Sequence, residues 1–439
     1  MRLRTMPGLA ISHWITGCFF WKSVFLIGVL AFPLAPARGQ EVPSPAPDSA
    51  QPASASDSVA QLHAFLEGGG NWAAIAEQPF AHHPLTQSQA DEAKTRLITA
   101  WQESVCEARK AERRAETLTE GDLRLPFFVK VFGDAPGSGR SLFISLHGGG
   151  GAPAQVNDGQ WQNQQRLYEP AEGVYVAPRA PTDTWNLWHQ PHVDFFLDRL
   201  IDVMVITEQV DRNRVYLMGY SAGGDGVYQL APRMADRWAA AAMMAGHPND
   251  ASPLSLRNLP FSLQVGGRDT AYNRHAIAAD WEKQLDGLRQ ADPTGYEHFV
   301  KIYPEHGHWM QREDAVALPW MAKFRRDPVP SRVVWKQDDV THPSFYWLAV
   351  DEANRKAGAL VTAAIDGQQV WVESGDVAKV TVHLDDRLVD LDQPVSLVVN
   401  GHATQPIQLG RTMATLASTL SQRGDPELSF SASLDVTLP

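Results

Sequence analysis

Residues 214–226 read RVYLMGYSAGGDG, and this stretch decides the fold. The run RVYLMG is short, apolar and β-prone, as in a buried strand, and the glycines after it lead into a helical pattern. Gly219, Ser221 and Gly223 form the pattern Gly-x-Ser-x-Gly at this junction. Small residues beside a serine permit a sharp strand-to-helix turn that projects its hydroxyl beyond the sheet. Because the pentapeptide alone is common, we rely on its position, which predicts that Ser221 is a nucleophile rather than an idle turn residue.

Strands and helices alternate on both sides of this turn, from about Leu125 to about Arg326. Such alternation predicts an α/β architecture, with a mainly parallel sheet and helices on both faces. Sites in these sheets form beyond the carboxyl ends of the strands. The expected strands are SLFISL (141–146), GVYVAPR (173–179), RVYLMG (214–219), AAAMMAG (240–246), FSLQVGG (261–267) and HFVKIYP (298–304), and the main expected helices are 193–210 and 271–289.

Candidates for an acid and a base follow the last two of these strands. A serine hydroxyl is a weak nucleophile at neutral pH, so it requires a base and a group that orients the base. Asp269 follows the strand 261–267, where the acid is expected, and His306 and His308 both follow the strand 298–304. We favour His308 as the base, because Gly307 frees the backbone before it and Trp309 can wall the site against water. In an extended segment both histidines point to the same side, so their spacing does not choose between them.

A run of glycines supplies candidate donors for an oxyanion. His147 is followed by four glycines directly after the strand 141–146. Glycines let the backbone approach a bound molecule without a Cβ in the way. We therefore expect the backbone N–H groups of Gly148 and Gly149, together with that of Ala222 after the nucleophile, to stabilise a developing oxyanion.

Residues 147–151 and 219–223, Asp269 and His308 together resemble the α/β-hydrolase superfamily. Within it, the sequence resembles bacterial esterases related to polyhydroxyalkanoate depolymerases and feruloyl esterases. The resemblance covers about Leu125 to Arg326. One position departs from these relatives, which often carry Gly-x-Gly-His at the base, because Glu305 replaces the first glycine here.

The resemblance implies a serine esterase that hydrolyses a small-molecule or polymer-borne carboxylic ester through an acyl-enzyme. A serine peptidase uses the same three residues, but the sequence contains no large propeller-like domain to select peptides. A non-catalytic envelope or carbohydrate-binding protein on a hydrolase scaffold is the third hypothesis, and such a scaffold has no need of an intact Ser, Asp and His set. The resemblance implies no cofactor.

Aromatic and histidine side chains are expected around the serine. Tryptophans beside a site favour flat, ring-shaped or apolar groups, although they can equally be packing residues. The expected substrate contacts are His147, Tyr220, Trp185, Trp188, His306 and Trp309. His189, His192 and Asp194 could also be read as metal ligands, but Pro191 interrupts the segment, so they do not share one helix face and we expect no metal there.

Charge and cysteine content limit the partners. Lys and Arg number 38 against 50 Asp and Glu, a formal net charge of −12, which argues against nucleic acid and anionic membranes as partners. Only Cys18 and Cys106 are present, so no disulfide framework can form. The sequence does not indicate an oligomeric state.

The chain is expected to contain five segments. Residues 1–39 have basic residues, an apolar run and small residues for cleavage, which is typical of a signal peptide, and predict a periplasmic or secreted protein. An uncleaved signal that anchors the chain is the alternative. We expect a Pro/Ala/Ser linker over 40–58, a helical leader over 59–120, the catalytic domain over 121–327 and a β-rich domain over 328–439.

The last segment reads as a small antiparallel β domain of short, β-branched and aromatic strands. Its role is open, and contact with carbohydrate or with the cell envelope is one hypothesis. If this domain is separate, a chain that ends near Asp327 should retain a folded catalytic core.

Overall fold

The computed structural model describes residues 55–438, which form one compact unit. The predicted signal peptide and residues 40–54 of the predicted linker lie outside the described residues. Helix α1 (Ala55–Glu67) begins inside the predicted linker. Among residues 55–438, no helix combines the length and the apolar character needed to cross a membrane.

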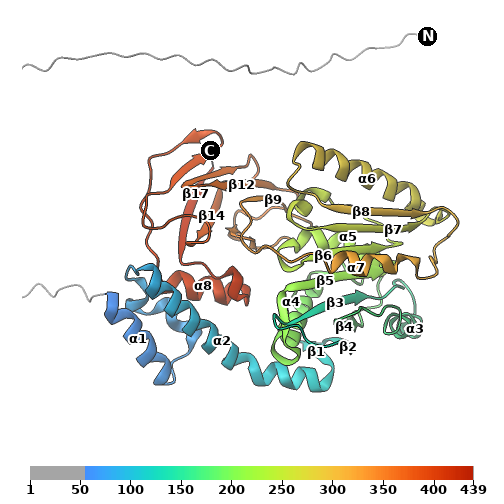
Figure 1. The fold of residues 1–439 in the computed structure, drawn as a ribbon, viewed down its shortest axis with the longest axis horizontal. Coiled ribbons are helices and arrows are strands. Elements are labelled where there is room, and N and C mark those ends of the chain that lie inside the picture. The colour runs from blue at the N-terminus through green and yellow to red at the C-terminus, as the bar shows by residue number, and fades with distance from the viewer. Residues whose placement is uncertain (1–54, 439) are drawn as a thin grey trace, which may run out of the picture. The chain divides into compact units, whose positions relative to one another are not determined.

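An eight-stranded sheet forms the centre of the fold (Figure 1). Its strand order is β1-β2-β4-β3-β5-β6-β7-β8, and all neighbouring pairs are parallel except β1 with β2 and β2 with β4. The predicted α/β class with a mainly parallel sheet is therefore confirmed. The strands are β1 (Thr117–Glu120), β2 (Leu123–Phe132), β3 (Arg140–Leu146), β4 (Gly173–Pro178), β5 (Val210–Tyr220), β6 (Ala240–Met244), β7 (Phe261–Gly266) and β8 (His298–Tyr303).

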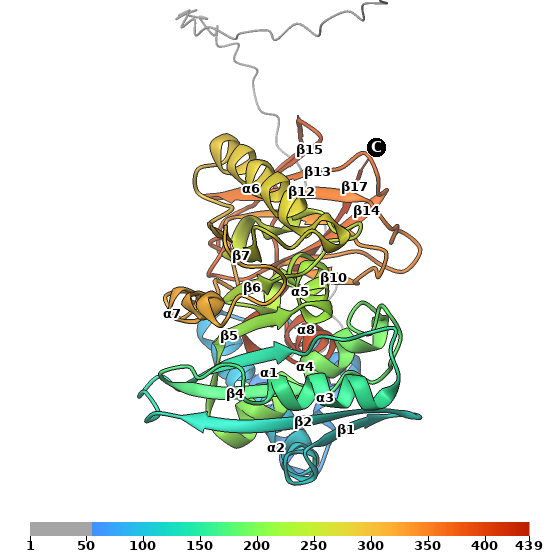
Figure 2. The ribbon, with the colours of Figure 1, turned by 90° about the vertical axis from the view of Figure 1, so that its right-hand side faces the viewer.

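Helices cover both faces of this sheet because successive side chains of each buried strand point to opposite faces (Figure 2). In β3, Leu142 and Ile144 belong to an apolar cluster with side chains of α4, α5 and α6, whereas Phe143 packs with side chains next to α3 and in α7. The helices are α3 (Ala154–Gln164), α4 (Pro191–Glu208), α5 (Ala222–Arg233), α6 (Arg274–Ala291) and α7 (Ala317–Met321).

The two ends of the described chain pack against each other. Helix α2 (Gln87–Ala115) and the short turns η1 (Trp72–Glu77) and η2 (Pro79–His82) contact helix α8 (Met413–Arg423), which lies beside them in Figure 1. Leu97 and Trp101 of α2 share a buried cluster with Leu416 and Leu420 of α8. The sequence predicted only strands in the last segment, so helix α8 is a correction; the Thr412 side chain caps its first turn, which is a weak local signal.

Residues 328–438 contain two further sheets. One has the order β10-β11-β14-β17 and the other β16-β15-β13-β12-β9, and their strands pair antiparallel except β13 with β15, which is parallel. The strands are β9 (Arg332–Lys336), β10 (Ser344–Phe345), β11 (Leu348–Ala349), β12 (Leu360–Asp366), β13 (Gln369–Glu373), β14 (Lys379–Leu384), β15 (Ser396–Val399), β16 (His402–Ala403) and β17 (Ala432–Thr437).

This β region is joined to the catalytic core by a continuous apolar cluster. Trp335 and Trp347 are buried in the same cluster as Leu142 of β3 and Leu230 of α5. The indole N–H of Trp347 donates to the carbonyl oxygen of Pro330 at 2.7 Å. The expectation that the core folds without the β region is thus at odds with this packing.

A buried ionic network crosses the same junction. The Asp236 carboxylate is fully buried and accepts hydrogen bonds from Arg237 Nη1 at 2.5 Å, from the backbone N–H of Tyr346 at 2.9 Å and from Arg423. Burial alone would raise the pKa of Asp236, but the charges of Arg237 and Arg423 outweigh it and hold that pKa below its usual range. Residues of the core, of β10–β11 and of α8 therefore meet at one carboxylate.

We predict that Asp236→Asn destabilises the protein by roughly 3–5 kcal/mol, because Arg423 is left buried without its counter-charge. The free energy of unfolding in urea measures this. Asp280→Asn, which removes an exposed carboxylate on α6 that pairs only with Lys283, is the matched control and should leave the midpoint unchanged. Equal midpoints for the two variants would contradict the structural role of Asp236.

We further predict that a chain ending at Asp327 does not fold cooperatively. Such a chain lacks Trp335 and Trp347, and their loss exposes the apolar cluster of the core. Soluble yield and thermal unfolding measure this. The control is a chain that begins at Ala53 and keeps every residue of the compact unit, which should unfold cooperatively. A soluble, cooperatively unfolding fragment that ends at Asp327 would show instead that the β region is independent.

Candidate active site

Ser221 occupies a strained turn between β5 and α5. Its backbone has φ 58° and ψ −122°, a positive-φ conformation that is unfavourable for a residue with a side chain. The flanking glycines allow the turn: a Cβ on Gly219 would lie 2.3 Å from the carbonyl oxygen of Gly223, and one on Gly223 would lie 2.1 Å from that of Leu146. Both glycines of the motif are therefore required by close backbone contacts, and the serine is held at the carboxyl end of β5.

Asp269, His308 and Ser221 form a continuous chain of hydrogen bonds. His308 Nε2 lies 3.0 Å from Ser221 Oγ, and His308 Nδ1 lies 2.7 Å from Asp269 Oδ2. Asp269 follows β7 and is buried, whereas His308 follows β8 and is partly exposed. A neutral imidazole in this position donates its Nδ1–H to the carboxylate and accepts the serine proton at Nε2.

The second histidine candidate faces elsewhere. His306 Nε2 lies 3.0 Å from Glu313 Oε1, and His306 is not among the residues that line the cavity at Ser221. Gly307 was expected to be needed so that the backbone could turn before His308. The structure corrects this, because a Cβ on Gly307 would meet no atom within 4 Å. The required glycine is Gly266 at the end of β7, where a Cβ would lie 1.9 Å from the Gly307 carbonyl oxygen. The histidine loop therefore crosses directly over β7.

Tyr220 fixes the position of the histidine loop. Its hydroxyl donates to the His308 carbonyl oxygen at 2.6 Å and accepts from the backbone N–H of Met310 at 3.1 Å. Burial raises the pKa of Tyr220 above its usual value, so the hydroxyl keeps its proton at neutral pH. The residue before Ser221 thus holds the loop that carries His308.

The glycine loop after β3 lies against the nucleophile. A Cβ on Gly148 would lie 3.2 Å from Ser221 Cβ, and Gly149 has φ +108°, a conformation that favours glycine. Asn157, which the sequence did not single out, holds the loop, since its Oδ1 accepts the backbone N–H of Gly150 at 2.9 Å. Ala222 is the first residue of α5, so its N–H has no partner within the helix and lies at the positive end of the helix dipole.

His147 is a buried support for this loop, which corrects its expected role as a substrate contact. His147 Nε2 accepts the backbone N–H of Ala180 at 3.1 Å, so the ring proton is on Nδ1, which donates to the Gly148 carbonyl oxygen at 2.6 Å. Burial lowers the pKa of His147 to about 4, so the ring is neutral at physiological pH. The imidazole orients the peptide that joins Gly148 to Gly149.

The expected role of Trp188 as a substrate contact is also corrected. Trp188 is fully buried, and its indole N–H donates to the His147 carbonyl oxygen at 2.9 Å, so it cannot contact a substrate. Trp309 is half-exposed and lines the cavity together with Tyr220. Trp185 is exposed next to Gly151 and lies outside the cavity lining. Sequence alone does not separate these tryptophans, because their burial depends on which segments pack against each of them.

A cavity of about 720 Å³ opens at Ser221 and is of the size that binds small molecules. Its walls combine apolar, amide and cationic side chains with Ser221, His308 and the glycine loop. They are Gly148, Gly149, Val156, Gln160, Asn163, Gln164, Arg166, Leu167, Tyr220, Ser221, His308, Trp309 and Arg312.

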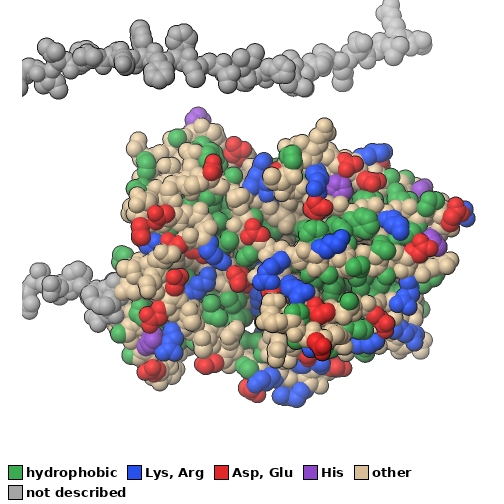
Figure 3. Space-filling model, viewed as in Figure 1, with side chains coloured by type: hydrophobic (Ala, Val, Ile, Leu, Met, Phe, Trp, Pro, Cys, Tyr) green, Lys and Arg blue, Asp and Glu red, His purple; other side chains and the backbone are tan. Residues whose placement is uncertain are grey.

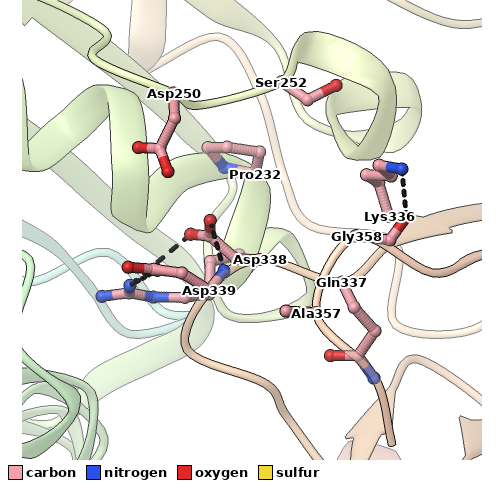
Figure 4. A pocket seen from close by; sticks show the side chains of 10 residues that line it. Pro232, Asp250, Ser252, Lys336, Gln337, Asp338, Asp339, Ala357 and Gly358 are labelled. Carbon is pink, nitrogen blue, oxygen red and sulfur yellow. Dashed lines mark hydrogen bonds and ion pairs between the residues drawn. The ribbon is translucent and has the colours of Figure 1, made fainter.

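A second hollow of about 320 Å³ lies between the end of α5 and the segment after β9 (Figure 4). Asp250, Lys336 and Asp338 surround it, and burial raises the pKa of Asp338 to about 6 against the opposing charge of Arg233. No residue of the Ser221 triad lines this hollow, so the first cavity is the candidate active site.

Of the three residues that could be read as metal ligands, Asp194 is engaged in other contacts. The Asp194 carboxylate accepts from Arg233 Nη2 at 2.7 Å and lies 2.8 Å from His342 Nε2. Within the described part of the chain, no three His, Cys, Asp or Glu side chains are grouped to hold a metal ion. Asp194 therefore links α4 to the β region.

The fold is an α/β-hydrolase fold, since a mainly parallel sheet carries serine, acid and histidine in that chain order after β5, β7 and β8. No protein-family model matches the sequence, and no curated protein matches it either. Solved structures with similar parts include a thermostable esterase, with 16% identity over 48% of this chain and 62% of the other and a TM-score of 0.36. This chain thus spans less than two thirds of that esterase.

Two further solved structures are similar to this chain. One is the LpqC poly(3-hydroxybutyrate) depolymerase from Bordetella parapertussis, with 16% identity over 47% of this chain and 87% of the other and a TM-score of 0.36. The other is a ferulic acid esterase, with 16% identity over 47% of this chain and 96% of the other and a TM-score of 0.32.

We predict that His308→Ala abolishes labelling of Ser221 by a fluorophosphonate probe, because the serine loses the base that accepts its proton. His306→Ala is the matched control and should still be labelled, since His306 contacts Glu313 rather than the serine. In-gel fluorescence of the two purified variants measures both. Labelling of His308→Ala at the wild-type rate would reverse the assignment.

Proposed function

We propose that this protein is a serine hydrolase that cleaves carboxylic esters through an acyl-enzyme. The observation that carries the proposal is the hydrogen-bonded chain from Asp269 through His308 to Ser221, at the floor of a cavity open to small molecules. A strained serine between two close-packed glycines is additional support, since structural turns rarely retain such a conformation without a functional reason.

The proposed first half-reaction acylates Ser221. Ser221 Oγ attacks the ester carbonyl carbon while His308 Nε2 takes the hydroxyl proton, and Asp269 stabilises the imidazolium that forms. Backbone N–H groups of Ala222 and of the glycine loop stabilise the negative charge on the carbonyl oxygen. The tetrahedral intermediate then collapses, the ester C–O bond breaks, and the alcohol leaves with the proton from His308.

The second half-reaction releases the acid. A water molecule attacks the acyl carbon as His308 takes one of its protons, a second oxyanion forms at the same N–H groups, and the bond from Ser221 Oγ to the acyl carbon breaks. The proton returns to Ser221 Oγ, and the enzyme is restored. His308 acts as base and then as acid in both halves, so its Nδ1 hydrogen bond to Asp269 must persist through the cycle, while Nε2 exchanges protons with Ser221 Oγ, the leaving alcohol and the water in turn.

The cavity suits a small ester. Helix α3, the glycine loop, the Ser221 turn and the histidine loop form its walls, and it is large enough for a compact acyl or alcohol group. We also propose that the protein acts outside the cytoplasm, on the basis of the basic and apolar pattern of residues 1–39.

We predict that Ser221→Ala removes all detectable hydrolysis of p-nitrophenyl esters, because no other group near His308 can form the acyl-enzyme. Ser252→Ala is the matched control, since Ser252 lines the second hollow and should retain activity. The rate of p-nitrophenol release with esters of graded chain length measures both variants. Hydrolysis by Ser221→Ala at the wild-type rate would contradict the proposal.

We also predict that Asp269→Asn lowers kcat by about 10³–10⁴-fold in the folded protein, because His308 loses the partner that fixes its tautomer. Steady-state kinetics on the best ester measure kcat, and a thermal melt checks that the variant is folded at the assay temperature. Activity within about threefold of wild type would place the acid elsewhere.

A further inference from the structure

We propose that Arg166 and Arg312 select substrates that carry an anionic group, such as a carboxylate, in addition to the ester. This inference rests on the proposed function and names the substrate class for the same site. Both arginines line the cavity that contains Ser221. They come from separate segments, since Arg166 follows α3 and Arg312 follows the histidine loop.

The charged side chains that line the cavity are all of one sign, which is positive. Arg166 and Arg312 line it, together with the titratable His308, and none of the lining residues is an aspartate or a glutamate. The protein as a whole has a net charge of −12, so a carboxylate-free wall with two guanidinium groups departs from the average surface. Figure 3 shows the usual pattern on one face, where acidic and basic side chains are interspersed.

Neither guanidinium is neutralised by an ion pair in the described part of the chain. Both arginines are exposed, and no ion pair among the described residues involves either of them. Arg166 Nη2 donates to Asn163 Oδ1 at 3.3 Å. Glu313 and Asp314 follow Arg312 in the chain: Glu313 contacts His306, and the buried Asp314 carboxylate accepts from Tyr168 and interacts with the Arg312 charge without an ion pair. Both cations therefore remain available to a bound anion.

The backbone places Arg312 at the cavity at an energetic cost. Gln311 and Arg312 are consecutive residues with φ 54° and φ 68°, a conformation that costs about 1–2 kcal/mol for each residue with a side chain. The hydrogen bonds on both sides of this pair hold it, from Met310 N–H to Tyr220 and from Glu313 N–H to the Met310 carbonyl oxygen at 3.0 Å. Paired left-handed residues persist where the surrounding structure fixes them, as at ligand sites.

The rest of the wall suits the neutral part of such a substrate. Val156, Leu167 and Trp309 provide apolar surface in the same cavity as the arginines and Ser221. A guanidinium group donates two parallel N–H bonds to a carboxylate, and it holds its charge at every physiological pH. The geometry points to an ester whose apolar acyl or alcohol part ends in an anion, with the arginines binding the anion while Ser221 attacks the carbonyl carbon.

The test compares esters that differ only in charge. Mono-p-nitrophenyl adipate and p-nitrophenyl hexanoate have acyl chains of equal carbon number, so they report an anion on the acyl side. The hexanoate esters of p-hydroxybenzoate and of phenol report an anion on the alcohol side. We expect the wild-type protein to show at least about a tenfold higher kcat/KM for the anionic member of one pair at low salt. The preference should fall as salt is raised, because exposed charges are screened.

Variants assign the preference to the two arginines. Arg166→Gln and Arg312→Gln should each lower the anionic-to-neutral ratio of kcat/KM by on the order of tenfold. Arg312→Lys keeps the charge and should retain part of the ratio. Lys323→Gln is the matched control, because it removes an exposed cation after α7 and should leave the ratio at the wild-type value.

Three results would overturn the inference while leaving the proposed function intact. The first is an equal kcat/KM for the anionic and neutral members of both pairs. The second is a preference for the anionic ester that survives both glutamine substitutions. The third is a loss of kcat/KM in the variants that is equal for anionic and neutral esters. If the wild-type protein hydrolyses none of the four esters and Ser221 is not labelled by a fluorophosphonate, the proposed function fails, and this inference fails with it.

Discussion

The close approach of four backbone segments at Ser221 is the constraint on which the rest of the site depends. Gly219 and Gly223 contact each other and Leu146, Gly148 lies against the serine, and the histidine loop crosses Gly266. The contacts of Gly219, Gly223 and Gly266 are at distances that exclude a Cβ, and that of Gly148 is tight, so close backbone packing positions Ser221, the glycine loop and the histidine loop. Such packing changes little under thermal motion, which is what a reaction that needs short, fixed distances requires.

Supporting contacts extend this rigidity outward from the serine. His147 holds the Gly148 carbonyl, Trp188 holds the His147 carbonyl, and Tyr220 holds the loop of His308. The core under these residues is continuous with Trp335 and Trp347 of the β region. Because the β region and α8 complete the buried cluster and the network at Asp236, they contribute to the site through the stability of the core, whatever further partner the β region has.

The parts of the site that could be predicted from sequence are those in which one local pattern specifies one local geometry. A strand, a glycine-flanked serine and a helix define the turn at Ser221, and the order of the strands places Asp269 and His308 on adjacent loops. Trp188 and Trp309 could not be told apart, because burial depends on which segment packs above each of them. Helix α8 is short and surrounded by strand-like runs, and its helical pattern is explained by tertiary contacts with α2 rather than by a strong local signal.

Local charge explains how an acidic protein can attract an anionic substrate. With a net charge of −12, the distant field repels an anion. At physiological salt, however, exposed charges further away than about 8 Å are largely screened, so the field inside a cavity is set by the groups that line it. Arg166 and Arg312 line the cavity, none of the other lining residues is an aspartate or a glutamate, and neither arginine forms an ion pair among the described residues. The negative net charge of the whole protein therefore limits non-specific partners, while the positive charges that line the cavity select the substrate.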